Sequence, residues 1–226
     1  MNLHILIIQL GTGIIVITFL VALLFRKKEK PGYFKYIEVF IFLGLLISLN
    51  SLTLGLKYVG SEEKINLVPA FIQELLIISQ YLCLYHFIYA LIKKTEFLGK
   101  IRTLMRLSII LFLLLLFISF WLKIDIRPSA VGGLFILGYC YFYVKDLMSN
   151  KPTLELLKSP EFWITSGIFF YATISTPVTA LVRLIPKDLN YINIRMQLFA
   201  VFNVSSILLY LSIIKGYICL KHQRSL

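Results

Sequence analysis

The chain has 226 residues, of which 59% are hydrophobic and 15% are charged, and its formal net charge is +12. Soluble domains carry about a quarter charged residues, so this deficit favours a membrane protein. The basic residues stand in short clusters between apolar runs, which is the pattern of membrane topology and not of a nucleic-acid-binding stripe. We therefore expect a lipid bilayer, and no nucleic acid, as the partner of this chain.

The apolar runs predict an all-α, polytopic fold, in which residues 1–226 form a single seven-transmembrane-helix bundle. About 20 apolar residues in a helix cross a hydrocarbon core of about 30 Å. The first run lacks the flanks of a cleaved signal peptide, so we expect it to be retained. In chain order the predicted spans are about 4–25, 34–56, 67–92, 107–122, 128–148, 162–184 and 197–219.

Two predicted spans carry local signals besides hydropathy. The sixth has a clear start, because Ser159 is a preferred N-cap residue, Pro160 suits the first helical position and Glu161 complements the helix dipole. Pro177 predicts a kink in the same helix, since proline removes a backbone hydrogen bond. The second span has small residues on one face, which predicts close helix packing. They are Gly44, Ser48, Ser51 and Gly55.

Lysine and arginine are distributed unequally between the two sides of the predicted bundle. The side reached after the first, third, fifth and seventh spans holds 16 of them, and the other side holds 7. Basic residues accumulate on the cytoplasmic side of membrane proteins. The count therefore predicts an N-terminus outside and a C-terminus in the cytoplasm. The predicted localisation is the bacterial cytoplasmic (inner) membrane, as a multi-pass protein.

Motifs for catalysis do not occur in this sequence. It has no GxSxG, no HExxH and no phosphate-binding loop. The three histidines, His4, His86 and His222, stand on different segments without the spacing of metal ligands. We therefore expect no enzymatic activity, no catalytic residue, no metal and no cofactor.

Polar residues within the predicted spans gather toward the outer half of the membrane. Glu74 lies about 10 Å below the outer boundary of the third span. An acid at mid-membrane costs about 2.5–3.5 kcal/mol, so Glu74 should face the bundle interior or a water-filled cavity. Tyr81 shares its helical stripe, and Gln73 and Gln80 lie beside it. The predicted ligand-binding residues are Glu74, Gln73, Gln80, Tyr81, Asn50, Thr176 and Asn203.

The same polar residues also have a structural interpretation. Amide and hydroxyl side chains join transmembrane helices through hydrogen bonds of about 0.6 kcal/mol each. We prefer this interpretation for Asn50, Asn203 and the threonines, and both interpretations stay open for Glu74. Because the inner half is more apolar, the pattern favours a pocket that opens outward over a continuous ion pathway.

The segment PEFWITSGIFFY, residues 160–171, resembles a pattern in small bacterial seven-helix membrane proteins. These are similar to the membrane-sensor modules that are fused to, or paired with, histidine kinases. The resemblance implies a membrane sensor or signalling accessory protein. The chain departs from the fused kinases in carrying no catalytic domain, so the implied partner is a separate membrane or cytoplasmic signalling protein, for example a histidine kinase. The matching residues are Pro160, Phe162, Trp163, Gly167 and Tyr171.

Three functions remain open at this stage. The first is a sensor that binds a small or lipidic ligand in an outward-facing polar pocket and signals to its partner, with Pro177 as a hinge. The second is a small transporter or channel subunit, which needs polar residues along its whole path. The third is a structural subunit of a larger membrane complex, which predicts stable co-purification with other membrane proteins and no ligand.

Overall fold

A computed structural model describes residues 3–25, 31–58, 67–92, 95–122, 129–148, 156–185 and 191–223. In these ranges the regular structure consists of seven long helices, which confirms the all-α, seven-helix prediction at that level. They are α1 (Leu3–Leu24), α2 (Phe34–Tyr58), α3 (Leu67–Leu91), α4 (Thr95–Leu122), α5 (Ser129–Met148), α7 (Pro160–Leu184) and α8 (Ile192–Gln223).

Most of these helices begin and end close to the predicted spans, but α4 and α8 are longer. Helix α4 begins at Thr95 and not near Leu107, because the helix continues through Lys100, Arg102 and Arg106. These charges interrupt the apolar run, yet lysine and arginine are good helix formers. Hydropathy therefore marks the apolar part of α4 and misses its first three turns.

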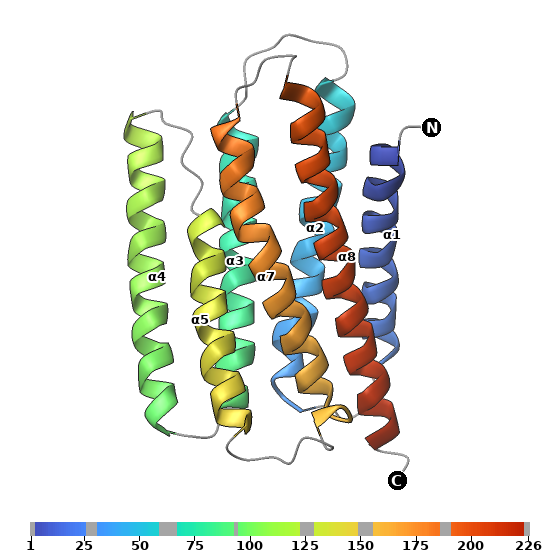
Figure 1. Ribbon diagram of the computed structural model, residues 1–226, viewed down its shortest axis with the longest axis vertical. Coiled ribbons are helices and arrows are strands. Elements are labelled where there is room, and N and C mark those ends of the chain that lie inside the picture. Colours follow the sequence, from blue (N-terminus) through green and yellow to red (C-terminus); the bar gives the residue numbers. More distant parts are fainter. Residues whose placement is uncertain are drawn as a thin grey trace.

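Successive helices run in opposite directions, so the two termini lie at opposite ends of the bundle (Figure 1). We call these the N-terminal end and the C-terminal end. Helices α1, α2, α3, α5, α7 and α8 form a closed ring in which each contacts the next and α8 returns to α1. Helix α4 stands outside this ring, packs mainly on α5 and touches α3 only slightly.

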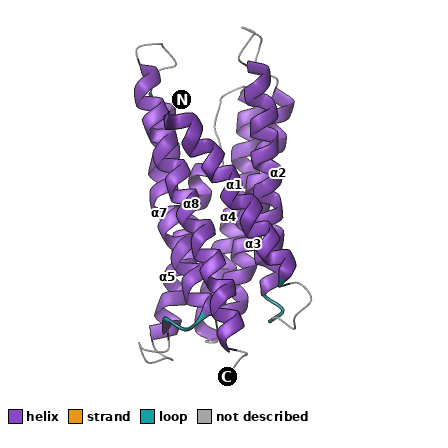
Figure 2. Cartoon of the chain, turned by 90° about the vertical axis from the view of Figure 1, so that its right-hand side faces the viewer, coloured by secondary structure: helices purple, strands orange, loops and turns teal. Residues whose placement is uncertain are grey.

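The buried core lies toward the C-terminal end. Tyr217, Phe34 and Phe87 are the largest of the completely buried side chains, and all three belong to that end. In contrast, no described side chain between residues 72 and 83 of α3 or between 45 and 49 of α2 is buried. Figure 2 shows that the helices diverge toward the N-terminal end. Among the side chains that the structure describes, the largest buried ones therefore gather toward the C-terminal end, while Ser175 and Val178 of α7 are buried nearer the other end.

Glycines allow the closest helix pair, α7 and α8, to approach. A Cβ atom on Gly216 would lie 2.6 Å from Cγ1 of Ile164, and one on Gly167 would lie 2.9 Å from the Ser212 hydroxyl. Small residues of this kind let helix backbones come together where large side chains would separate them. The pair fixes the start of α7 against the end of α8.

Within the described ranges, three helices are long and apolar enough to cross a membrane, judged by length and composition. The stretches are Val131–Met148, Pro160–Val182 and Asn193–His222. Two shorter apolar stretches, Gln9–Leu24 and Leu75–Leu91, belong to α1 and α3. Length and apolar composition are the two properties that a membrane-crossing helix requires.

Candidate functional site

Gln80 lies inside the ring, where α3 faces α2 and α8. Its Nε2 donates a hydrogen bond of 3.2 Å to the backbone oxygen of Phe40 on α2. A Cβ atom on Gly44 would lie 3.1 Å from the same Nε2 and would also meet the hydroxyl of Tyr210. Gly44 thus leaves room for two polar groups at the centre of the ring. The predicted packing face of α2 is confirmed at this glycine.

Tyr81 and Thr176 approach α5 at two adjacent glycines. The Tyr81 ring lies against Gly132 and stacks on Phe112, with ring centres 6.1 Å apart. The Thr176 hydroxyl lies against Gly133. It is buried and has no hydrogen-bond partner among the described residues. The glycine pair therefore brings α3 and α7 onto α5, and Thr176 offers an unused hydroxyl there.

Asn203 lies where α8 meets α1. Its Nδ2 donates to the backbone oxygen of Phe199 at 2.8 Å, and its Oδ1 lies 3.8 Å from the position of a Cβ atom on Gly11. The hydrogen bond stays within α8, so Asn203 lies beside α1 without the interhelical hydrogen bond to a described residue that the packing interpretation expects. The side chains of the other three predicted residues lie outside the part that the structure describes, so their role stays a prediction. They are Glu74, Gln73 and Asn50.

The described members of the predicted site thus do not converge on one cavity. Gln80 contacts α2, Tyr81 and Thr176 contact α5, and Asn203 contacts α1. Each one occupies a contact between two helices of the ring. A ligand that bonds to them would have to replace or open such a contact.

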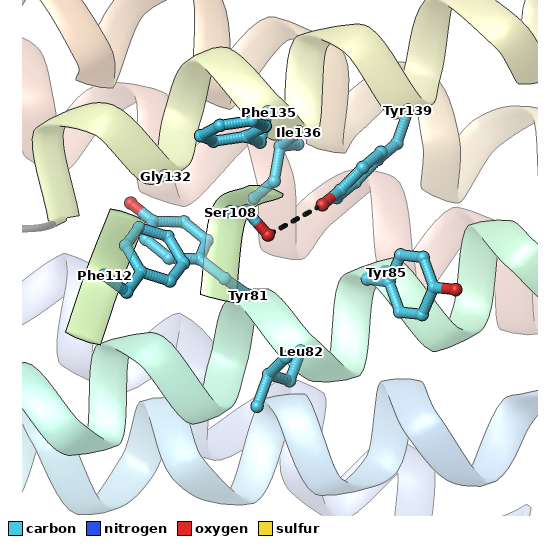
Figure 3. A pocket seen from close by; sticks show the side chains of 9 residues that line it. All are labelled: Tyr81, Leu82, Tyr85, Ser108, Phe112, Gly132, Phe135, Ile136 and Tyr139. Carbon is cyan, nitrogen blue, oxygen red and sulfur yellow. Dashed lines mark hydrogen bonds between the residues drawn. The ribbon is translucent and has the colours of Figure 1, made fainter. Parts of the chain in front are cut away.

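A small cleft lies between α3, α4 and α5 (Figure 3), and only Tyr81 of the predicted residues lines it. It has room for about one water molecule. Within it the hydroxyls of Ser108 and Tyr139 are 3.2 Å apart and form a buried hydrogen bond. The signal for this cleft in the sequence is a pair of tyrosines one helical turn apart on α3, Tyr81 and Tyr85.

A polar cluster at the C-terminal end also escapes the sequence analysis. The hydroxyl of Tyr33, just before α2, donates to Oε1 of Glu161 on α7, and the Ser159 hydroxyl donates to Oε2. Ser159 is the N-cap residue of α7 but makes no side-chain bond to the helix backbone, so the predicted role of its hydroxyl is wrong. Burial, and then the hydrogen bond to Glu161, raise the pKa of the Tyr33 phenol above its ordinary value.

Helix α5 extends this cluster with two buried residues. Tyr143 and Asp146 are 4% and 3% exposed. Helix α5 packs against α7, and the Tyr143 phenol lies near both Glu161 and Asp146. We call Tyr33, Ser159, Glu161, Tyr143 and Asp146 the end cluster. It connects the segment before α2 to α5 and to the start of α7.

Metal binding finds no support in the described part of the chain, where no three histidine, cysteine or acidic side chains come together. His86 donates from Nδ1 to the backbone oxygen of Leu82, 2.8 Å away in the same helix, and its ring stacks on Tyr36. This is the behaviour of a hydrogen-bonded core residue. The cysteines are free thiols that are buried or half-buried, namely Cys83, Cys140 and Cys219.

No family model, no curated protein and no solved structure matches the chain. The resemblance of residues 160–171 to kinase-associated sensor modules therefore rests on the sequence pattern alone. In the fold, Pro160 and Gly167 are buried against α8, and the Tyr171 ring lies edge-on to Phe202 at 5.9 Å. The packing of α7 on α8 is thus a physical reason for the pattern.

Proposed function

We propose that the chain crosses the bacterial cytoplasmic membrane with all seven helices, with its N-terminus outside and its C-terminus in the cytoplasm. Large apolar side chains are exposed on every helix, and lipid makes such exposure favourable. The bias in lysine and arginine supports the direction. In a variant without its native cysteines, Tyr191→Cys should react with an impermeant maleimide in intact cells and Lys158→Cys only in inverted vesicles. The reverse pattern would overturn the orientation.

The proposed function is that of a membrane sensor, which binds a small or lipidic ligand between its helices near the N-terminal end and signals to a partner at the other end. One observation carries this proposal, namely the unequal packing of the two ends. The C-terminal end is filled by large buried side chains such as Tyr217 and Phe87. Nearer the middle, helices meet where Gln80 and Thr176 pack against glycines. Such contacts can adopt a second arrangement while the packed end stays closed.

The packed end argues against a transporter or channel. A conduit needs a polar path through the bundle, and large buried side chains such as Phe34, Phe87 and Tyr217 fill the C-terminal end. A sensor needs no such path, and it requires only that a helix movement at the ligand site reaches the C-terminal end. Helix α7 continues through Pro177, next to Thr176, although proline has no backbone N–H and one hydrogen bond of the helix is therefore missing there. That position is the proposed hinge, and the end cluster is the contact through which α7 acts on its neighbours.

The ligand proposal is tested with a cationic amphiphile, since Glu74 is the acid in the predicted site. The probe is dodecylamine, and dodecanol is the neutral control of equal chain length. Binding to the folded state raises the melting temperature. Dodecylamine should therefore stabilise the protein in nanodiscs, dodecanol should not, and Glu74→Gln should abolish the shift while the variant still folds. An equal shift in Glu74→Gln, or none in the natural sequence, would remove this ligand class and the site with it.

The conduit is tested separately with the protein reconstituted in sealed liposomes. We expect no protein-dependent release of a trapped fluorescent anion or of a proton gradient. Release that scales with the amount of protein would contradict the sensor proposal in favour of the transporter or channel.

A further inference from the structure

The cleft of Figure 3 is lined by hydroxyl-bearing and apolar side chains. The hydroxyls of Ser108 and Tyr139 face each other in it, whereas the Tyr85 hydroxyl points away. Leu82 and Phe112 belong to the apolar part of the lining. Because α4 stands outside the ring and touches α3 only slightly, this cleft lies at the edge of the bundle and not at its centre. It shares Tyr81 with the predicted ligand-binding residues, and its other lining residues lie outside that set.

Two arginines of α4 lie on the C-terminal side of the cleft. Arg102 donates a hydrogen bond of 2.8 Å from Nη2 to the hydroxyl of Tyr89 on α3. Arg106 lies one turn farther along α4. Both side chains are exposed. An exposed guanidinium group can bind a phosphate through paired hydrogen bonds, and two of them one helical turn apart can reach the same phosphate.

The arginines also mark a boundary along α4. The helix carries charged residues up to Arg106 and none from Leu107 to Leu122. In a membrane-embedded helix this change falls at the level of the lipid headgroups. A phosphate at Arg102 and Arg106 would therefore lie at headgroup depth, and the cleft would begin where the acyl chains begin.

We propose that the two arginines and the cleft bind one anionic phospholipid. Its phosphate contacts Arg102 and Arg106, and one acyl chain enters between α3 and α4 beside Leu82 and Phe112. The cleft has room for about one water molecule, so entry of the chain requires α4 to separate from α3. Their few mutual contacts make this separation feasible. The inference rests on the membrane embedding proposed above, and not on the sensor ligand.

The test is native mass spectrometry of the full chain extracted from nanodiscs of phosphatidylglycerol and phosphatidylcholine. We expect the natural sequence to retain phosphatidylglycerol in preference to phosphatidylcholine. The double variant R102Q/R106Q should lower that preference about tenfold, because it removes the two guanidinium groups that bind the phosphate through paired hydrogen bonds. K215Q/K221Q removes two exposed charges from α8 at the same end and should change it little. Excess inorganic phosphate should not displace the retained lipid.

Any one of three results would overturn the inference. The first is that the natural sequence shows no preference for phosphatidylglycerol. The second is that the two double variants lose the preference equally, and the third is that inorganic phosphate displaces the lipid completely. The first result needs no variant, so misfolding of R102Q/R106Q cannot hide it. Extraction by alkaline carbonate is measured on the cell membranes from which the protein is purified. A protein that resists carbonate but lacks the preference refutes this site alone, whereas one that carbonate releases refutes the membrane embedding itself.

Discussion

Replacing Tyr33 by phenylalanine tests whether the end cluster holds the C-terminal end together. The change removes the hydroxyl that donates to Oε1 of Glu161. Ring packing is kept, since the Tyr33 ring lies 5.9 Å from that of Phe87 and 5.3 Å from that of Phe34. Ser159 still donates to the other carboxylate oxygen, so Glu161 keeps one partner. The substitution therefore isolates a single hydrogen bond.

The size of the effect follows from the chemistry of this bond. A hydrogen bond to a charged group contributes about 1.5–3 kcal/mol to stability, and half-burial of Tyr33 and Glu161 places it in the lower part of that range, about 1.5–2 kcal/mol. For a chain of this length each kcal/mol changes the melting temperature by about 2–4 °C. We expect Tyr33→Phe to melt about 3–8 °C below the natural sequence, measured by thermal denaturation in detergent with size-exclusion detection.

Tyr36→Phe is the matched control. Tyr36 lies in the next helical turn, is also half-buried and stacks on His86 at 5.3 Å, and phenylalanine keeps that stacking. Its hydroxyl makes no hydrogen bond to another described residue, so the expected change is within about 0.5 kcal/mol. Equal melting temperatures for Tyr33→Phe and Tyr36→Phe would refute the argument, because the bond to Glu161 would then contribute nothing.

Three further predictions follow from named contacts. Because the pKa of Tyr33 is raised, its contribution is complete below the ordinary tyrosine value of about 10 and is lost as pH rises above it. Parallel melts between about pH 8 and 11 should therefore show the natural sequence losing its advantage over Tyr33→Phe above about pH 10. Gly44→Ala should destabilise by about 1–3 kcal/mol, since its Cβ meets polar groups of two helices, whereas Gly13→Ala, with open space around it, should be neutral or slightly stabilising in the same melts. A double-mutant cycle of Ser108→Ala and Tyr139→Phe should give a coupling of about 0.5–1.5 kcal/mol, and additive effects would show that their hydrogen bond is unimportant.

Hydropathy predicts the number of helices well because one physical requirement sets both the apolar run and the helix. A buried or lipid-facing backbone must form its hydrogen bonds internally, and the helix does this over the whole run. The start of α4 is predicted poorly because the apolar run begins only after Lys100, Arg102 and Arg106, whereas the helix already includes these three residues. Charge and helix formation are separate properties, and only the first is visible in a hydropathy pattern.

The contacts of the candidate site are harder to predict, because they join segments far apart in the chain. Tyr33 and Glu161 are separated by 128 positions, and no local spacing connects them. A second contact of Glu161, which is local in the chain, explains the wrong expectation for the Ser159 hydroxyl. A local rule directs its hydroxyl to the backbone of the first helical turn. In the folded chain a carboxylate two residues away accepts that hydrogen bond in its place.

The division of the predicted polar residues among several helix contacts bears on how a sensor of this kind would work. A ligand that hydrogen-bonds to Gln80 competes with the Phe40 backbone oxygen, and one that bonds to Asn203 acts where α8 meets α1. An interhelical hydrogen bond such as that from Gln80 to Phe40 contributes only about 0.6 kcal/mol. A ligand present at 100 times its dissociation constant supplies about 2.7 kcal/mol to the state that binds it. Binding free energy of that size exceeds several such contacts, so occupancy and helix rearrangement would be thermodynamically linked.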